Sequence, residues 1–223
     1  MKTLFKKEIL LCTNAQIIIY ALLALTILIP SYPPAVGVLY ALGGLMSLFP
    51  RTLANKDIEY TALLPVKKTD VVKGKMLFLI AYGIATMIIA VIGSLIRVLM
   101  LEPSVMKGLD EGEIAYYQSV SPTVSLLGFG FLAFGIMNLV MISVYYRNPY
   151  KKLTAPSLLS LLAASIVLTI GQIVIAFVPA LRSYEGMGLF GQVLIAAIGF
   201  LLFLFSSFLG YKIGAKEFEK IDL

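Results

Sequence analysis

Long apolar runs alternate with short polar segments along the whole chain of 223 residues. An α-helix needs about 20 residues to cross the roughly 30 Å of hydrocarbon in a bilayer. Six runs approach or exceed that length, so the pattern predicts an all-α protein with six membrane-spanning helices in one transmembrane domain, residues 1–223. The predicted spans are 11–29, 34–49, 76–101, 122–146, 156–178 and 187–211.

Composition agrees with a membrane protein. Of all residues, 60% are hydrophobic and only 13% are charged, whereas a soluble domain has roughly 45–50% apolar and about 25% charged residues. Cys12 is the single cysteine and histidine is absent. The chain therefore has no disulfide framework, no cysteine metal site and no histidine to act as a general base or metal ligand.

The basic residues are distributed unevenly between the predicted loops. If both termini are cytoplasmic, 15 of the 18 lysines and arginines lie on the cytoplasmic side. Only Lys107 and Arg182 lie outside, and Arg97 lies within a span. Because cytoplasmic loops are enriched in lysine and arginine, this arrangement fixes the predicted orientation. The net charge of +6 is explained by topology and does not indicate nucleic-acid binding.

The largest predicted cytoplasmic loop, 51–75, has more pattern than topology requires. Pro65 disfavours α geometry at Leu64, and Thr69 is expected to cap a new helix that enters the third span. The loop is therefore predicted to form a helix, a corner and a second helix. Its lysines could serve topology alone, or the short helix could be bound by a soluble partner.

The loop stretch KDIEYTALLPVKKTDVVKGKML resembles the cytoplasmic loop of bacterial ABC exporter permeases of the six-helix class, a class that includes the permeases of phenol-soluble-modulin exporters. The N-terminal MKTLFKKEIL is similar to the amphipathic elbow helix of that family. The stretch YYRNPYKKL matches the family between spans four and five in part. The loop positions that match are Asp57, Tyr60, Leu64, Pro65, Val66, Lys68, Asp70, Val71, Val72 and Lys75.

The resemblance implies a transport subunit that is not itself an enzyme, in the bacterial cytoplasmic membrane. It would export an amphipathic or hydrophobic cargo such as a peptide, a lipid-like molecule or a drug. It would work as a pair of permeases, identical or homologous, with separate ATPase subunits that bind ATP and magnesium. The chain itself contains no phosphate-binding loop of the pattern GxxxxGK[ST]. The residues expected to contact the ATPase are Asp57, Glu59, Tyr60, Leu64, Pro65, Val66, Lys67, Lys68 and Asp70.

Polar residues within the spans suggest where a translocation path could lie. Arg97 is the only charge inside a predicted span, and it lies about one turn from the outer end. Its side chain could snorkel to the surface, or it could line a cavity or pair with another group. Ser165, Thr169 and Gln172 share one face of the fifth span, which predicts either interhelical hydrogen bonding or a cargo path.

Two other classes of function compete with the exporter subunit. A secondary transporter or channel without an ATPase partner usually needs acidic groups near the midplane, and no Asp or Glu lies inside the six predicted spans. An intramembrane enzyme would need a nucleophile and a base, and the sequence contains no such arrangement that we recognise. The exporter interpretation is therefore the main prediction.

Overall fold

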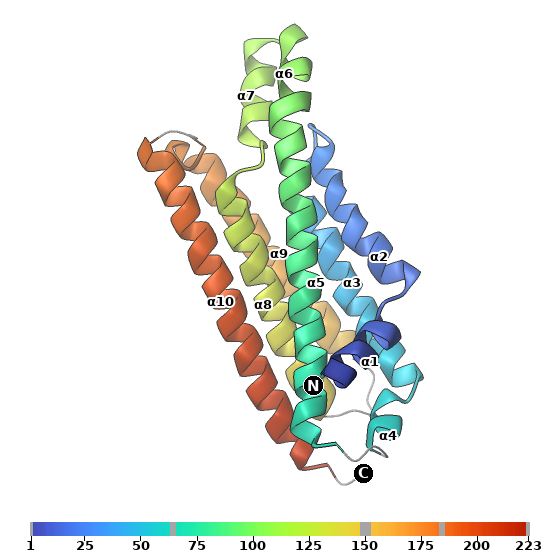
Figure 1. Cartoon of the computed structure of the whole chain (residues 1–223). Coiled ribbons are helices and arrows are strands. Elements are labelled where there is room, and N and C mark those ends of the chain that lie inside the picture. Colours follow the sequence, from blue (N-terminus) through green and yellow to red (C-terminus); the bar gives the residue numbers. More distant parts are fainter. Residues whose placement is uncertain (1, 63–65, 148–152, 183–185, 222–223) are drawn as a thin grey trace.

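The structure is a computed structural model, and it describes residues 2–62, 66–147, 153–182 and 186–221. These residues form helices and no strand (Figure 1). The long helices are α3 (Ala35–Ala54), α5 (Lys68–Ile96), α8 (Val124–Arg147), α9 (Thr154–Phe177) and α10 (Gly186–Glu219). The shorter helical segments are α1 (Lys2–Cys12), α2 (Ala15–Leu22), η1 (Leu23–Leu28), α4 (Asp57–Ala62), η2 (Arg97–Leu101), α6 (Glu102–Val105), η3 (Met106–Gly108), α7 (Glu111–Ser119) and η4 (Pro179–Leu181).

The five long helices are each long and apolar enough to cross a membrane. A sixth span results if the bent pair formed by α1 and the α2–η1 segment is counted as one. The protein is therefore membrane-embedded, with five to six candidate spans. The second to sixth predicted spans correspond to the long helices within a few residues at most ends.

The first predicted span, 11–29, is interrupted near its start. Helix α1 ends at Cys12, and the chain bends by 82° before it continues as α2. Asn14 causes the restart because its side chain accepts a hydrogen bond from the backbone N–H of Ile17, at 3.1 Å, as an N-cap residue does. A helix thus covers the predicted elbow segment, whose functional role stays a prediction.

The loop between α3 and α5 contains the expected short helix, α4. The predicted cap is wrong, however: α5 begins at Lys68 with Lys67 as its N-cap residue, and Thr69 already lies inside the helix. Helix α3 continues through Pro50 to Ala54, although Pro50 has no backbone N–H to donate to the carbonyl of residue 46. The predicted corner at Leu64 and Pro65 lies outside the described residues.

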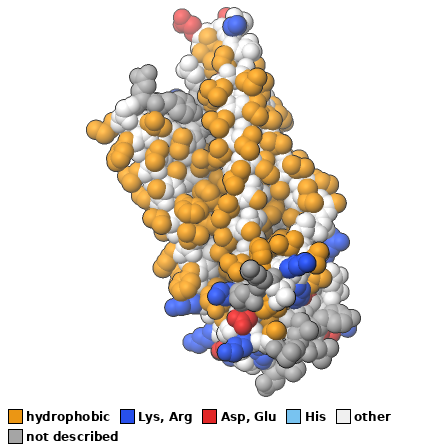
Figure 2. Space-filling view, viewed as in Figure 1, with side chains coloured by type: hydrophobic (Ala, Val, Ile, Leu, Met, Phe, Trp, Pro, Cys, Tyr) orange, Lys and Arg blue, Asp and Glu red, His pale blue; other side chains and the backbone are white. Residues whose placement is uncertain are grey.

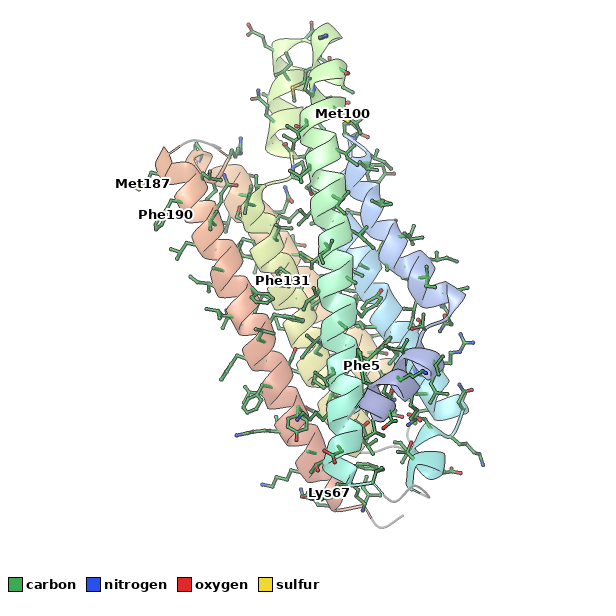
Figure 3. All side chains as sticks on the ribbon, viewed as in Figure 1. Phe5, Lys67, Met100, Phe131, Met187 and Phe190 are labelled. Atoms are coloured by element: carbon green, nitrogen blue, oxygen red, sulfur yellow. The ribbon has the colours of Figure 1, made fainter. Side chains whose placement is uncertain are left out.

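Helices α8 and α10 pack with their backbones in close contact. A Cβ atom on Gly199 would overlap the carbonyl oxygen of Gly128, and one on Gly128 would overlap the backbone at Ile195. The rings of Phe131 on α8 and Phe200 on α10 also pack together, with 5.1 Å between their centroids (Figure 3 labels Phe131). The glycine-rich stretch 128–135 therefore serves close helix packing.

The two ends of the bundle differ in charge and shape. Helices α1 and α4, the start of α5 and the end of α10 lie together at one end, which we call the basic end (Figure 1). Figure 2 shows lysine and arginine side chains gathered there, below a largely apolar surface. At the opposite end, α6 and α7 form a helical hairpin in the segment predicted as an external loop, and it projects beyond α8–α10.

Candidate functional site

A cluster of four charged side chains lies at the basic end between α1, α4 and α5, three of them buried and the fourth, Lys7, partly exposed. Lys75 on α5 has no exposed surface, and its Nζ lies 2.9 Å from Asp57 Oδ2 on α4 and 3.5 Å from Glu8 Oε2 on α1. Lys7 closes the cluster, with its Nζ 2.7 Å from Asp57 Oδ1 and 3.4 Å from Glu8 Oε1. We call these four residues the ionic cluster.

The ionic cluster balances two cations against two anions, which is why it tolerates burial. A buried charge without a partner costs several kcal/mol, whereas a well-paired group recovers much of that cost. Burial alone would raise the pKa of Asp57, but the charges of Lys75 and Lys7 and their hydrogen bonds outweigh it and hold the pKa below its ordinary value. Asp57 is therefore a carboxylate at neutral pH.

Neighbouring side chains complete the surroundings of the ionic cluster. Lys7 Nζ also donates to Thr61 Oγ1 at 2.6 Å, and the Thr61 hydroxyl donates to the Asp57 carbonyl at 2.6 Å. The ring of Tyr145 on α8 lies 4.9 Å from Lys75 Nζ, an arrangement that a cation–π interaction stabilises. Helix α4 is thus attached from within to α1 and α5, beside α8.

The predicted ATPase-contact residues divide into buried and exposed groups. Asp57 is only 6% exposed, so its side chain is not accessible to a partner in this structure. Lys68 donates to the carbonyl of Ile221 and lies over the ring of Phe218, and Asp70 is partly exposed in the first turn of α5. The described part of the structure does not include Leu64, Pro65 or the side chain of Tyr60.

Three of the predicted contact residues face outward. Glu59 on α4 is exposed, and its Oε2 lies 3.6 Å from Nζ of Lys56, in the turn just before the helix. Val66 is 38% exposed, and Lys67 is exposed at the tip of the basic end (Figure 3). These three side chains are therefore accessible at the surface of the basic end.

Arg97 does not snorkel, contrary to the first alternative. Its side chain has no exposed surface, and Nε donates to Glu102 Oε1 at 3.0 Å. Its two terminal nitrogens donate to five backbone carbonyl oxygens at 2.8–3.2 Å. These carbonyls belong to Ile27, Ile29, Pro30, Tyr32 and Val120.

The Arg97 contacts therefore connect three segments: the turn after η1, the start of the α6–α7 hairpin and the link into α8. Glu102, which the sequence placed in an external loop, is only 7% exposed and also accepts from the Ser121 hydroxyl at 2.9 Å. The place of Arg97 on a translocation path stays a prediction. The pairing role, which was the second alternative, fits its surroundings.

The polar face of α9 lines a groove against α3. Ser165, Thr169 and Gln172 lie along it, with Val36 and Leu39 on the α3 side, around a volume of about 270 Å³. The Ser165 and Thr169 hydroxyls donate to carbonyls of their own helix, and Gln172 Oε1 is buried without a hydrogen bond. The three residues are thus brought to one groove, as their spacing predicted.

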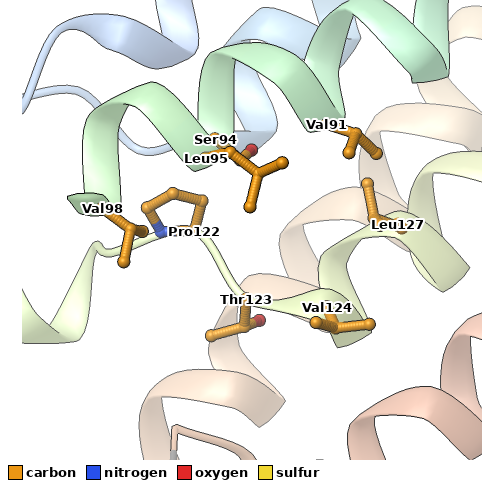
Figure 4. Close-up of a pocket in the computed structure, with 8 residues that line it drawn as sticks. All are labelled: Val91, Ser94, Leu95, Val98, Pro122, Thr123, Val124 and Leu127. Carbon is orange, nitrogen blue, oxygen red and sulfur yellow. The ribbon is translucent and has the colours of Figure 1, made fainter. Parts of the chain in front are cut away.

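A second cleft separates α5 from the start of α8 at the end opposite the basic end. Figure 4 shows its apolar lining, with Val91, Leu95 and Val98 facing Pro122 and Leu127 around about 100 Å³. This cleft has few polar atoms. Among the described residues, no group of three or more histidine, cysteine, aspartate or glutamate side chains could hold a metal ion.

Sequence reasoning missed Lys7, Glu8 and the role of Lys75. A signal was present, because Glu8 is the only acidic residue among the first 56 and it lies next to a lysine in an otherwise basic arm. Lys75 belongs to the loop motif, as does Asp57, but the motif alone does not say that the two side chains meet. No family model, no curated protein and no solved structure matches the chain.

Proposed function

We propose that the chain is the transmembrane subunit of an ATP-driven exporter in the bacterial cytoplasmic membrane, with the basic end and both termini in the cytoplasm. One observation supports this most. Helix α4 lies at the end of the bundle, is attached to α1 and α5 by the ionic cluster, and carries exposed residues on its outer side and just beyond it.

The proposed partner is a separate ATPase that binds ATP and magnesium. Glu59, Val66 and Lys67 would form part of its contact surface, with Leu64 and Pro65 between them in sequence. A displacement of α4 by the ATPase would reach α1 and α5 through Asp57, because buried ion pairs resist separation. Rigid-body shifts of helices are a common way to open a cavity.

The proposed cargo is amphipathic or hydrophobic, and its path would include the α9 face with Ser165, Thr169 and Gln172. The groove at this face is small, about 270 Å³, and it is apolar apart from these side chains. One subunit therefore encloses too little volume for a large cargo. We propose that a second copy or a homologue completes the path.

The test is to purify the tagged chain from its source membranes and to identify bound proteins. We expect an ATPase with a phosphate-binding loop, in a complex with two permease subunits by native mass measurement. The double substitution Val66→Asp and Lys67→Glu should weaken this complex at least tenfold. Lys216→Glu, an exposed cation at the same end on α10, is the matched control and should leave it intact.

Two outcomes would overturn the proposal. One is a stable complex in which the loop substitutions change nothing, since α4 would then not be the contact. The other is transport by the purified chain in vesicles without an ATPase, which would favour a secondary transporter or channel.

The proposed orientation has its own test. Single cysteines at Lys67 and Lys107, both exposed, should react with a membrane-impermeant reagent from opposite sides of the membrane in intact cells and inverted vesicles. Cys12 is buried and gives a low background. Labelling of both positions from the same side would contradict the orientation.

A further inference from the structure

An apolar groove lies where α1 crosses α2 and α5. It has a volume of about 270 Å³, and its twelve lining residues come from all three helices and the turn between α1 and α2. Phe5 and Ile9 line it from α1, and Figure 3 shows Phe5 beside α5. We call it the α1 groove.

The lining of the α1 groove is mostly apolar. Two of its lining residues, Thr13 and Tyr82, carry a polar side-chain atom. The Tyr82 hydroxyl already donates to the carbonyl of Ala41 at 2.8 Å, so it offers no free donor. Thr13 lies at the turn between α1 and α2, toward the basic end. A ligand that fits would have an apolar body and a polar group at that turn.

The length of the α1 groove matches one leaflet of a bilayer. On α5 its lining extends from Phe78 to Ile89, a rise of about 17 Å at 1.5 Å per residue. Half of the roughly 30 Å hydrocarbon core is about 15 Å. Helix α1 closes the groove at the basic end, where we expect the lipid headgroups of that leaflet.

The charge beside the α1 groove favours an anion. Glu8, the acidic residue of α1, is buried and paired with Lys7 and Lys75. Lys6 is exposed, directly after the groove residue Phe5, and no described acidic group lies within ion-pair distance of it. A cation near the surface of an anionic leaflet stabilises binding.

We infer that the α1 groove binds an anionic phospholipid from the leaflet at the basic end, with one acyl chain between α2 and α5 and the headgroup near Lys6 and Thr13. This inference does not depend on the exporter function. It assigns to α1 a lipid contact that would hold the helix in the interface, as an amphipathic segment lies.

The experiment is to measure lipid binding to the purified full chain by native mass spectrometry, with phosphatidylglycerol and phosphatidylcholine of equal chain length. We expect phosphatidylglycerol to bind more tightly. Lys6→Gln should weaken its binding about fivefold, the effect of one lysine near an anionic surface, and should leave phosphatidylcholine unchanged. Ala85→Phe places a ring in the groove from an exposed position on α5 and should remove the tight site for both lipids.

Two control variants show whether a change in lipid binding is specific to the α1 groove or follows from losing a lysine or adding a ring anywhere on the protein. Lys216→Gln removes an exposed cation at the same end, and Ala197→Phe adds a ring to an exposed position of α10. Both should bind phosphatidylglycerol as the unchanged chain does. Equal binding of the two lipids, or tight binding that survives in folded Ala85→Phe protein, would overturn the inference. Since Lys6 is exposed, its variant tests the headgroup even if the groove variant fails to fold.

Discussion

Lys75 in α5 and Asp57 in α4 form a buried ion pair, with 2.9 Å between Lys75 Nζ and Asp57 Oδ2. Lys75 has no exposed surface and Asp57 is 6% exposed. Together with Lys7 and Glu8, they connect the short helix of the loop to the bundle. The outer side of α4 is thus available to a partner, while ion pairs attach its inner side to the bundle.

The ionic cluster predicts a specific pattern of stability in a double-mutant cycle. Lys75→Met alone leaves two buried carboxylates with one lysine, and should lower the free energy of unfolding by about 3 to 5 kcal/mol. Adding Asp57→Asn restores the charge balance between Lys7 and Glu8, and should recover more than half of that loss. The measurement is denaturant or thermal unfolding of the purified protein in detergent.

An exposed pair supplies the control for this cycle. Lys56 and Glu59 lie 3.6 Å apart on the surface, and such pairs contribute only about 0–1 kcal/mol. Lys56→Gln should therefore change stability little. If Lys75→Met were equally mild, the ionic cluster would not hold α4 in place.

The lowered pKa of Asp57 predicts how stability depends on pH. A carboxyl group whose pKa is lower in the folded state than in the unfolded state stabilises the fold while it is charged. This contribution is complete above the ordinary pKa, 3.8, and it is lost as the pH falls through the pKa of the folded state. The difference in unfolding free energy between the unchanged chain and Asp57→Asn should thus be constant from about pH 8 to about pH 5. It should shrink only in more acidic solution. A difference that already fades near neutral pH would contradict the depressed pKa.

The hydrogen bonds of Arg97 predict that lysine cannot replace arginine at this position. An ammonium group has three donors without the planar fork of a guanidinium, so it cannot serve five carbonyls and Glu102 together. We expect Arg97→Lys to cost about 2 kcal/mol or more of stability, because buried acceptors lose their donors. Arg97→Met should cost more and should be partly rescued by Glu102→Gln. Thermal unfolding measures each effect.

Arg182 provides the comparison for Arg97. It is partly exposed and donates to one carbonyl, that of Ile175, at 3.1 Å. Arg182→Met should therefore be mild. A silent Arg97→Lys variant would show that the contacts of Arg97 do not contribute to holding the outer segments.

The close packing of α8 against α10 predicts that Gly199 tolerates no side chain. Gly199→Leu should prevent normal packing, because its Cβ would overlap the backbone of Gly128, and overpacking of this kind costs at least about 1 to 3 kcal/mol. Gly112→Ala, where nothing lies within 4 Å of the added atom, is the control. The yield of folded protein in gel filtration and its melting temperature distinguish the two.

The sequence by itself determined the apolar helices and most of their bounds. Runs such as 156–178 and 187–211 are long enough to cross a bilayer, and this follows from length and hydropathy without any tertiary contact. The spacing of Ser165, Thr169 and Gln172 likewise placed them on one face. The bend at Asn14 was missed because an N-cap residue inside an apolar run leaves hydropathy almost unchanged.

Only the tertiary structure decided which charges are paired. Glu8, Asp57 and Lys75 come from three separate helices, and no local pattern says that packing will bring their side chains together. For the same reason the sequence left the role of Arg97 open, since its partners are carbonyls of a distant turn and a carboxylate in a predicted loop. A buried charge is removed from water and therefore needs another protein group as its partner. Which charges are buried depends on how the helices pack.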